Sequence, residues 1–383
     1  MDSEQEQIRT QVAALCAGFP GEYWRKKDRA REYPGEFVTA LTEAGWLACL
    51  VPEVYGGSGL GLGDANVILE EIHASGCNGA VAHAQIYTMG TILRHGSDAQ
   101  KSRYLPDIAA GRKRLQAFGV SEPESGSDTL SLATRAVRDG DEFVINGSKV
   151  WTSRAEHSDL MLLLARTAPK DDVAHRTEGL SVFLVEMDVA KGAGLDIRPI
   201  RTMINHATCE IFFDNLRVPA ANMIGDEGKG FLYILDGMNA ERILIAAECI
   251  GDGRWFIDRA TAYAGERRVF GRPIGQNQGV QFPIARAYSN LRAAALMVDK
   301  AASLFDAGEK CAEEGNMAKL LASEAAWEAG DTCMQTFGGY GFAEEMDVER
   351  KFRETRLYRT APISTNMILA YIAEHVLGLP RSY

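Results

Sequence analysis

The spacing of hydrophobic residues changes twice along this chain, and that change constrains the fold more than any single motif. Up to about residue 117 the hydrophobic residues recur every three to four positions, which predicts helices. From 118 to about 228 they alternate with period two, which predicts strands, and four long helical patterns follow. The sequence therefore predicts an α+β fold with three domains: an all-α domain at 1–117, a β-barrel or sandwich at 118–228, and a four-helix bundle at 229–383.

The expected elements can be given by range. Helices are predicted near 3–18, 35–45, 64–75, 80–95, 98–110, 229–264, 280–307, 313–337 and 363–377, and strands near 133–138, 160–165, 180–185 and 209–213. Ser97 and Gln100 form a capping box, in which each side chain bonds the backbone N–H of the other residue, and they should begin the helix at 98–110.

Two motifs stand close together near the start of the strand-rich region. Asn146-Gly147 joins two β-rich runs and predicts the tight turn of a hairpin, because both residues accept positive φ. The segment 121–128 has no hydrophobic period but gathers glycine, hydroxyls and backbone N–H groups, which suit contacts to a phosphate or to a ring edge. We expect a binding loop on a rigid sheet.

Charge and cysteine usage exclude several classes of protein. The formal charge of −11 and the lack of a basic block argue against nucleic acid or an anionic membrane as the partner. No stretch reaches the ~18 apolar residues of a membrane span. The seven cysteines are scattered and form no CxxC pair, which indicates reduced, mostly buried thiols and no zinc site. With no signal or transit pattern at the N-terminus, we expect a cytoplasmic protein without a metal.

A glycine-rich segment at 54–61 raises the question of a dinucleotide site. It lacks the GxGxxG spacing, and no βαβ pattern precedes it, so we interpret it as a flexible turn.

One carboxylate interrupts a hydrophobic helical face. Phe231, Ile234, Leu235 and Met238 follow helical spacing, and the next position of that stripe is Glu241. Burial would raise the pKa of a carboxyl group there and make it a base for a weakly acidic C–H proton. The alternative is a slightly rotated helix with this carboxylate solvated or paired with a distant arginine.

The chain resembles the acyl-CoA dehydrogenase family in two motifs, Val120-Ser-Glu-Pro-Glu-Ser-Gly-Ser-Asp128 and Asn146-Gly-Ser-Lys-Val-Trp151. The resemblance implies FAD as cofactor, with Trp151 beside the isoalloxazine and with the Val120 backbone and the Ser121 and Ser153 hydroxyls bonding its polar edge. It also places Phe118, Gly126 and Ser127 at the cofactor. Without the resemblance, a tryptophan at this position reads as a core residue.

The resemblance also decides between the two interpretations of the carboxylate. Family members carry the catalytic glutamate either in a late loop or on this helix directly before an arginine, as in the isovaleryl and long-chain branches. Here Pro362 stands at the late-loop position, whereas Glu241 precedes Arg242, so Glu241 is the expected base. Proline also lacks the N–H that would bond the thioester carbonyl, so we expect Ile363 to donate instead, or the flavin and another group to hold the carbonyl.

Further cofactor contacts follow from the resemblance, several of them to FAD bound by a neighbouring subunit. They are Arg267, Phe270, Gln278, Gln335, Gly339, Ser364 and Asn366. They imply a homotetramer, a dimer of cofactor-sharing dimers. His206 lies where the family has a different loop; we expect it to be solvated or locally bonded and assign it no role.

The resemblance implies dehydrogenation of an acyl-CoA, as in fatty acid β-oxidation. Glu241 would remove the α-proton, the β-hydride would pass to flavin N5, and a trans-2-enoyl-CoA would form. The electrons would then pass from the flavin to an electron-transferring flavoprotein. Ser127, Asn239 and Arg242 would contact the CoA thioester, and Tyr87 with Met89 would line the acyl pocket. Two alternatives remain: a specialised enzyme for a branched, aromatic or heteroatom-bearing acyl group, which would act by oxidation or by elimination, and a flavoprotein that binds acyl-CoA without turnover.

Overall fold

The structure is a computed structural model that describes residues 3–382 and divides into two compact units. Unit 1 comprises residues up to Ala30, Gly61–Gly79 and the chain from Asn239 onward. Unit 2 comprises Arg31–Leu60 and Ala80–Met238. The mixed helix and sheet content confirms the predicted α+β fold class, while the division at 117 and 228 stays a prediction.

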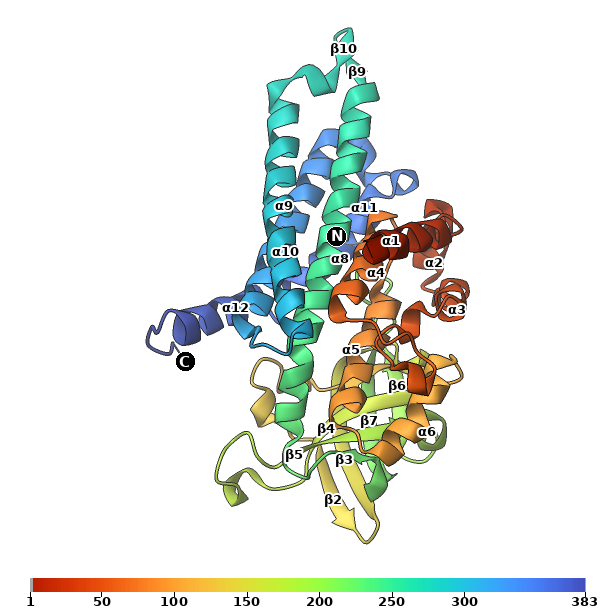
Figure 1. Ribbon diagram of the computed structural model, residues 1–383, viewed down its shortest axis with the longest axis vertical. Coiled ribbons are helices and arrows are strands. Elements are labelled where there is room, and N and C mark those ends of the chain that lie inside the picture. The colour runs from red at the N-terminus through yellow and green to blue at the C-terminus, as the bar shows by residue number, and fades with distance from the viewer. Residues whose placement is uncertain (1–2, 383) are drawn as a thin grey trace. The chain divides into compact units, whose positions relative to one another are not determined.

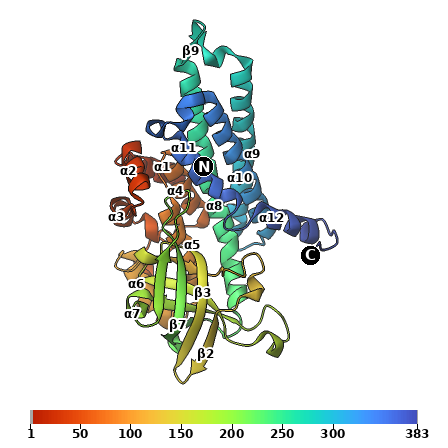
Figure 2. The same ribbon diagram turned by 180° about the vertical axis from the view of Figure 1, so that it is seen from behind.

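Unit 2 is built on one eight-stranded sheet, seen from behind in Figure 2. Its strands are β1 (Leu115–Gly119), β2 (Arg135–Asp139), β3 (Glu142–Ser153), β4 (Leu160–Arg166), β5 (Leu180–Glu186), β6 (Leu195–Pro199), β7 (Thr208–Pro219) and β8 (Met223–Ile224). The order is β6-β7-β3-β2-β4-β5-β8, and β1 pairs in parallel with β4.

The neighbouring strands β4 and β5 are buried on both faces, which explains their uninterrupted apolar runs. One face packs against the apolar residues of β3 and β7. The other packs against α5 (Ala80–His95) and α6 (Asp98–Ala109). Unit 2 also contains α3 (Gly35–Glu43), the short α7 (Met187–Ala190) and the first turns of α8 (Gly230–Glu266).

The predicted hairpin turn at Asn146-Gly147 is wrong. β3 runs through both residues with only a register shift against β7, and the hairpin turn between β2 and β3 lies instead at Gly140, whose φ is 63°. Gly147 has a φ of 145°, and a Cβ on it would lie 2.5 Å from the Thr134 hydroxyl. The glycine therefore serves close packing between strands and not a turn.

Unit 1 is helical. It contains α1 (Ser3–Cys16), α2 (Gly21–Ala30), α4 (Leu62–Ala74), α9 (Gln278–Asp306), α10 (Ala312–Phe337), α11 (Val348–Arg356) and α12 (Thr365–Tyr371), together with most of α8 (Gly230–Glu266). In Figure 1, α8, α9 and α10 run side by side, and Gly253 of α8 faces Leu291 of α9 at close range. The short hairpin of β9 (Arg268–Val269) and β10 (Arg272–Pro273) joins α8 to α9.

A cluster of buried polar side chains, the α8 network, ties three helices of unit 1 together. Asp252 of α8 accepts hydrogen bonds from His73 Nδ1 at 2.8 Å and from the Thr355 hydroxyl at 2.6 Å, and it pairs with Lys351 of α11. His73 Nε2 accepts the Gly79 N–H at 2.9 Å, so the imidazole carries its proton on Nδ1. These side chains are fully buried, and each is held by the others.

Most predicted elements are present within a few residues. The capping box is confirmed: the Ser97 hydroxyl accepts the Gln100 N–H at 3.2 Å, and Gln100 accepts the Ser97 N–H at 3.0 Å. The sequence did not predict α2, α11, β1 and β6, nor the short elements α7 (Met187–Ala190), β8, β9 and β10.

Candidate functional site

A buried ion pair between Lys149 and Glu122 holds the start of the loop that follows β1. Lys149 Nζ donates to the Val120 carbonyl at 2.9 Å and to the Glu122 carboxylate at 2.8 Å. Glu122 also accepts the backbone N–H groups of Ala133 at 2.6 Å and Thr134 at 2.9 Å. Burial opposes ionisation of Glu122, but the lysine charge and these donors outweigh it and lower the pKa of that carboxyl. The loop is therefore held at its base by charge-assisted bonds.

Trp151 lies beside this loop in an unusual backbone conformation. Its φ is 63°, at a register shift of β3 against β7 between Lys149 and Thr152. Its side chain is 61% exposed, so the interpretation as a core residue is wrong. A bulky residue at positive φ costs roughly 1–3 kcal/mol and is found mainly at functional sites. The bulge turns a flat apolar face outward, next to the loop.

Polar groups around Trp151 fit the edge of a planar cofactor. Val150 N–H bonds the Ser121 carbonyl at 2.9 Å, whereas the Ser121 N–H makes no hydrogen bond to any residue from 3 to 382. The buried Thr152 hydroxyl likewise has no partner within that range. Ser153 is half-buried, Gly126 and Ser127 are exposed, and a Cβ on Gly126 would meet no atom within 4 Å. An open loop, an apolar ring and unpaired donors suit the flavin that the family resemblance implies.

Two aromatic residues extend this side of unit 2 toward α5. The Tyr87 and Phe118 rings meet edge to face at 5.5 Å, and His83 lies 4.9 Å from Tyr87. Met89, which the sequence reading placed with Tyr87 in an acyl pocket, is fully buried in the core against α6 and the sheet. Of the two, only Tyr87 keeps an accessible face.

His206 is bonded locally, as expected. Its Nδ1 lies 3.2 Å from the Arg154 guanidinium. Burial, Arg154 and His83 hold the pKa of His206 well below its ordinary value, so the imidazole is neutral and accepts this bond. The structure gives no reason to assign His206 a chemical role.

Glu241 of α8 is 8% exposed, so the prediction that its carboxylate is buried holds. The stripe leading to it is less regular than predicted, because Leu235 is 37% exposed. Arg242 is buried next to it and donates to the Asn239 side chain at 2.8 Å. Burial lowers the pKa of Arg242, and the Glu241 charge opposes that shift. A carboxylate, a guanidinium and an amide thus share one turn of helix in unit 1.

The late loop of unit 1 is fixed by a second buried lysine. Lys319 of α10 donates to the Ile363 carbonyl at 2.7 Å, directly after Pro362. Burial lowers the pKa of Lys319 to about 8. The Ser364 hydroxyl accepts the Met367 N–H at the start of α12, and Asn366 is exposed on its first turn. Ser364 is therefore partly engaged as a helix cap.

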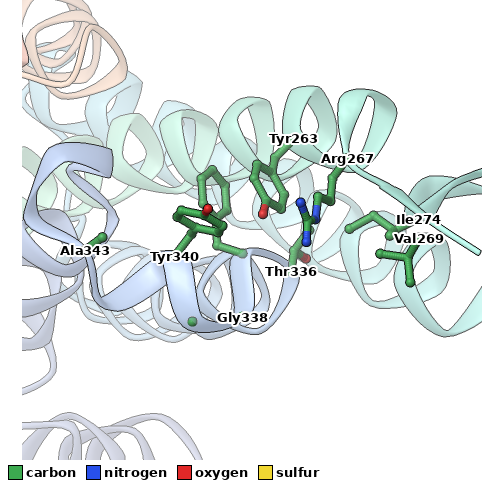
Figure 3. A pocket seen from close by; sticks show the side chains of 10 residues that line it. Tyr263, Arg267, Val269, Ile274, Thr336, Gly338, Tyr340 and Ala343 are labelled. Atoms are coloured by element: carbon green, nitrogen blue, oxygen red, sulfur yellow. The ribbon is translucent and has the colours of Figure 1, made fainter.

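A pocket of about 560 Å³ lies near the end of α8 in unit 1 (Figure 3). Arg267 and Gly339, two predicted cofactor residues, line it together with Tyr263, Phe337 and Tyr340. The Tyr263 and Phe337 rings stack at 4.1 Å. A guanidinium, bare glycine backbone and aromatic faces in one pocket suit a nucleotide with its phosphates.

Other predicted cofactor residues of unit 1 do not line this pocket. Phe270 is fully exposed at the tip of the β9–β10 hairpin with a φ of 52°, and Gln278 and Gln335 are exposed. Ser364 and Asn366 lie at the start of α12, away from that hairpin (Figure 1). The sequence reading missed Lys149 and Lys319. The sequence signal that could have identified these two residues is a lysine at an inward position of an apolar pattern.

Family models match nearly the whole chain. They are the acyl-CoA dehydrogenase N-terminal domain at residues 2–112, the middle domain at 117–216 and the C-terminal domain at 228–377. The acyl-CoA dehydrogenase FadE12 of Mycobacterium tuberculosis is 35% identical over 389 aligned positions, covering 100% of this chain and 98% of that protein.

Two solved structures share the fold. A glutaryl-coenzyme A dehydrogenase in complex with glutaryl-CoA superposes with a TM-score of 0.92 at 29% identity, covering 100% of this chain and 97% of the other. PigA with FAD and proline superposes with a TM-score of 0.92 at 26% identity, covering 99% and 98%.

Two absences apply to residues 3–382. No helix there is long and apolar enough to cross a membrane. No disulfide joins the seven cysteines, all of which lie in that range and are buried.

Proposed function

Since the chain belongs to the acyl-CoA dehydrogenase family, we propose that it oxidises an acyl-CoA thioester to the trans-2-enoyl-CoA, with Glu241 as the base. The chain is an FAD-dependent oxidoreductase of this family. The observation that carries the proposal is the buried carboxylate of Glu241, directly before Arg242 on α8.

In the proposed reaction the residues of each unit have different roles. Glu241 takes the α-proton as the Cα–Cβ double bond forms, while bound FAD supplies the acceptor for the β-hydride. Arg242 and Asn239, bonded to each other, would hold the CoA thioester with Ser127. Trp151 and the 121–128 loop would orient the cofactor and exclude water from it. Tyr87 would limit the acyl group.

The thioester carbonyl needs a donor that Pro362 cannot supply. We propose the Ile363 N–H for this role, because Lys319 already fixes the carbonyl of the same residue. A fixed donor stabilises the negative charge that develops on the thioester oxygen, as in an oxyanion hole.

Lys319→Met tests this assignment. Without the ammonium the late loop loses its anchor, and a displacement near 1 Å costs roughly 10²-fold in rate. We expect kcat for acyl-CoA oxidation to fall about tenfold to a hundredfold with a smaller change in KM. Steady-state kinetics with an artificial electron acceptor measures both constants.

Lys300→Met, an exposed site on α9, is the control and should keep the wild-type rate. Lys319→Arg retains a cationic donor and should recover part of kcat. If Lys319→Met keeps the wild-type kcat, the late loop does not hold the thioester.

We further propose a homotetramer in which the α8-end pocket binds the nucleotide part of FAD from a neighbouring subunit. The fully exposed Phe270 next to this pocket supports a covered surface there. We propose an electron-transferring flavoprotein as the acceptor and the cytoplasm as the location, the latter on the reduced, buried cysteines.

Arg267→Ala tests the pocket. Loss of a charge-assisted bond to phosphate costs about 1.5–3 kcal/mol, so we expect FAD to bind the apoprotein roughly tenfold to a hundredfold more weakly. Quenching of flavin fluorescence on reconstitution measures the Kd. Arg268→Ala, the next residue along and outside the pocket, should bind FAD normally; equal losses in both variants would exclude a specific phosphate contact.

The function itself is tested with a panel of straight, branched, aromatic and dicarboxylic acyl-CoAs. We expect one class to reduce the artificial acceptor and to yield a product lighter by two hydrogens. A product that has instead lost a leaving group from Cβ would identify the elimination alternative. Binding without any product from the whole panel would contradict the proposed activity.

A further inference from the structure

We propose that Lys149 is a positioning residue that tunes the redox potential of FAD by polarising the peptide between Val120 and Ser121. The inference rests on the proposed function only in that the 121–128 loop holds the flavin. It concerns Lys149, to which neither the sequence analysis nor the family resemblance gave a role.

The Lys149 ammonium lies next to the peptide group that joins Val120 to Ser121. Lys149 Nζ lies 2.9 Å from the Val120 carbonyl oxygen. In a trans peptide the carbonyl and the N–H point in opposite directions, so the Ser121 N–H faces away from the ammonium. The Ser121 carbonyl is fixed by the Val150 N–H at 2.9 Å, so the residue cannot turn. The Ser121 N–H, without a partner among residues 3–382, is thus presented outward from a fixed frame.

The ammonium makes that N–H a stronger donor. A cation bonded to an amide oxygen draws electron density toward the oxygen, and hydrogen bonds in series strengthen one another. Lys149 is fully buried, so no water screens its charge. A strengthened donor at the flavin edge favours the reduced cofactor, which carries more negative charge than the oxidised one.

The cation is retained at a cost, which argues for a role beyond packing. Burial lowers the pKa of Lys149 to about 8, although Glu122 opposes the shift. An unfolded lysine titrates near ~10.4, so between these values the folded state binds fewer protons than the unfolded state. The lysine therefore disfavours folding below about pH 8, and this cost is relieved as pH rises toward ~10.4. Apolar residues in place of a buried ion pair often leave stability unchanged or higher, yet the charge is present.

A purely structural role for the Lys149–Glu122 pair makes a different prediction from tuning. If the pair only holds the loop, its removal lowers stability and FAD affinity together and leaves the potential of the flavin that remains bound unchanged. If the pair also tunes the redox potential, its removal lowers the midpoint potential of the bound flavin even in a variant that folds.

The experiment measures the FAD midpoint potential by reductive titration against reference dyes, without any acyl-CoA. The variants are Lys149→Met and the double variant Glu122→Gln with Lys149→Met, which leaves no unpaired buried carboxylate. Val185→Ala, buried in β5, a strand that pairs with neither β1 nor β3, is the control for loss of stability. Thermal unfolding of each holoenzyme is measured beside the potential.

We expect both lysine variants to lose about tenfold in their preference for reduced over oxidised FAD, a fall of about 30 mV for this two-electron couple. Val185→Ala should lose stability with no change in potential. An unchanged potential in Lys149→Met or, should that variant not fold, in the double variant overturns the proposal. Because no thioester is used, this outcome is distinct from failure of the wild type to oxidise acyl-CoA, which would instead contradict the proposed function.

Discussion

Glu241→Gln is expected to slow reduction of the flavin by acyl-CoA by roughly 10²–10⁴-fold while leaving FAD and acyl-CoA bound. The amide has nearly the same shape as the carboxylate but cannot accept the α-proton. Removal of a general base typically costs 10²–10⁴-fold. Anaerobic stopped-flow mixing with the best thioester of the panel measures the rate at which the flavin bleaches.

The control for Glu241→Gln is Asp258→Asn, an exposed carboxylate on the same helix, which should bleach at the wild-type rate. Glu241→Asp, whose carboxylate is withdrawn by one methylene, should bleach the flavin at a rate between those of Glu241→Gln and Asp258→Asn. Bleaching of Glu241→Gln at the wild-type rate would remove this residue from the mechanism.

Lys351→Met is expected to destabilise unit 1 by about 3–5 kcal/mol, because it leaves Asp252 as a buried, unpaired charge in the α8 network. The network lies on α8, the helix that also carries Glu241, so activity should fall with stability. Urea denaturation of the holoenzyme measures the change.

Two comparisons separate this effect from a general loss of charge on α11. Arg356→Met, an exposed site on the same helix that contacts the Trp327 ring and the Thr360 hydroxyl, should change stability by no more than about 1 kcal/mol. Lys351→Met with Asp252→Asn removes both charges and should be more stable than Lys351→Met alone. Equal stability of Lys351→Met and Arg356→Met would show that the buried pair does not matter.

The same network predicts sensitivity to acid. Burial alone would raise the pKa of Asp252, but the charge of Lys351 and the hydrogen bonds from Lys351 and His73 lower it well below its ordinary value. A carboxyl group with a lowered folded-state pKa stabilises the fold above its unfolded pKa of ~3.9 and loses that contribution as pH falls through the folded value. Stability should therefore drop below about pH 4, and less steeply in the double variant.

Hydrophobic period predicted most of the helices and the longer strands, because the amphipathic elements bury one continuous face and β4 and β5 form uninterrupted apolar runs. It missed α11, whose sequence reads as a solvated loop although Arg350, Lys351 and Glu354 are buried. Charged residues reveal such burial only through partners that are distant in sequence, here Asp252 and the chain near Gly76.

The site was predicted in part for a similar reason. The burial of Glu241 was predicted from a local signal, a charged residue that breaks an apolar stripe on one helix, whereas its proposed role as base needed the family resemblance. Trp151 needed the family resemblance, since the sequence alone favours a core position and the bulge at its positive φ leaves no local pattern. The Asn146-Gly147 signal misled because a packing glycine and a turn glycine look alike until the neighbour, Thr134, is known.

Anaerobic mixing of the wild-type holoenzyme with the thioester selected from the panel is the most direct test of acyl-CoA oxidation by this protein. We expect the flavin to bleach in a single turnover, with one trans-2-enoyl-CoA formed for each flavin reduced. A shift of the flavin spectrum without bleaching, from a thioester that demonstrably binds, would contradict it.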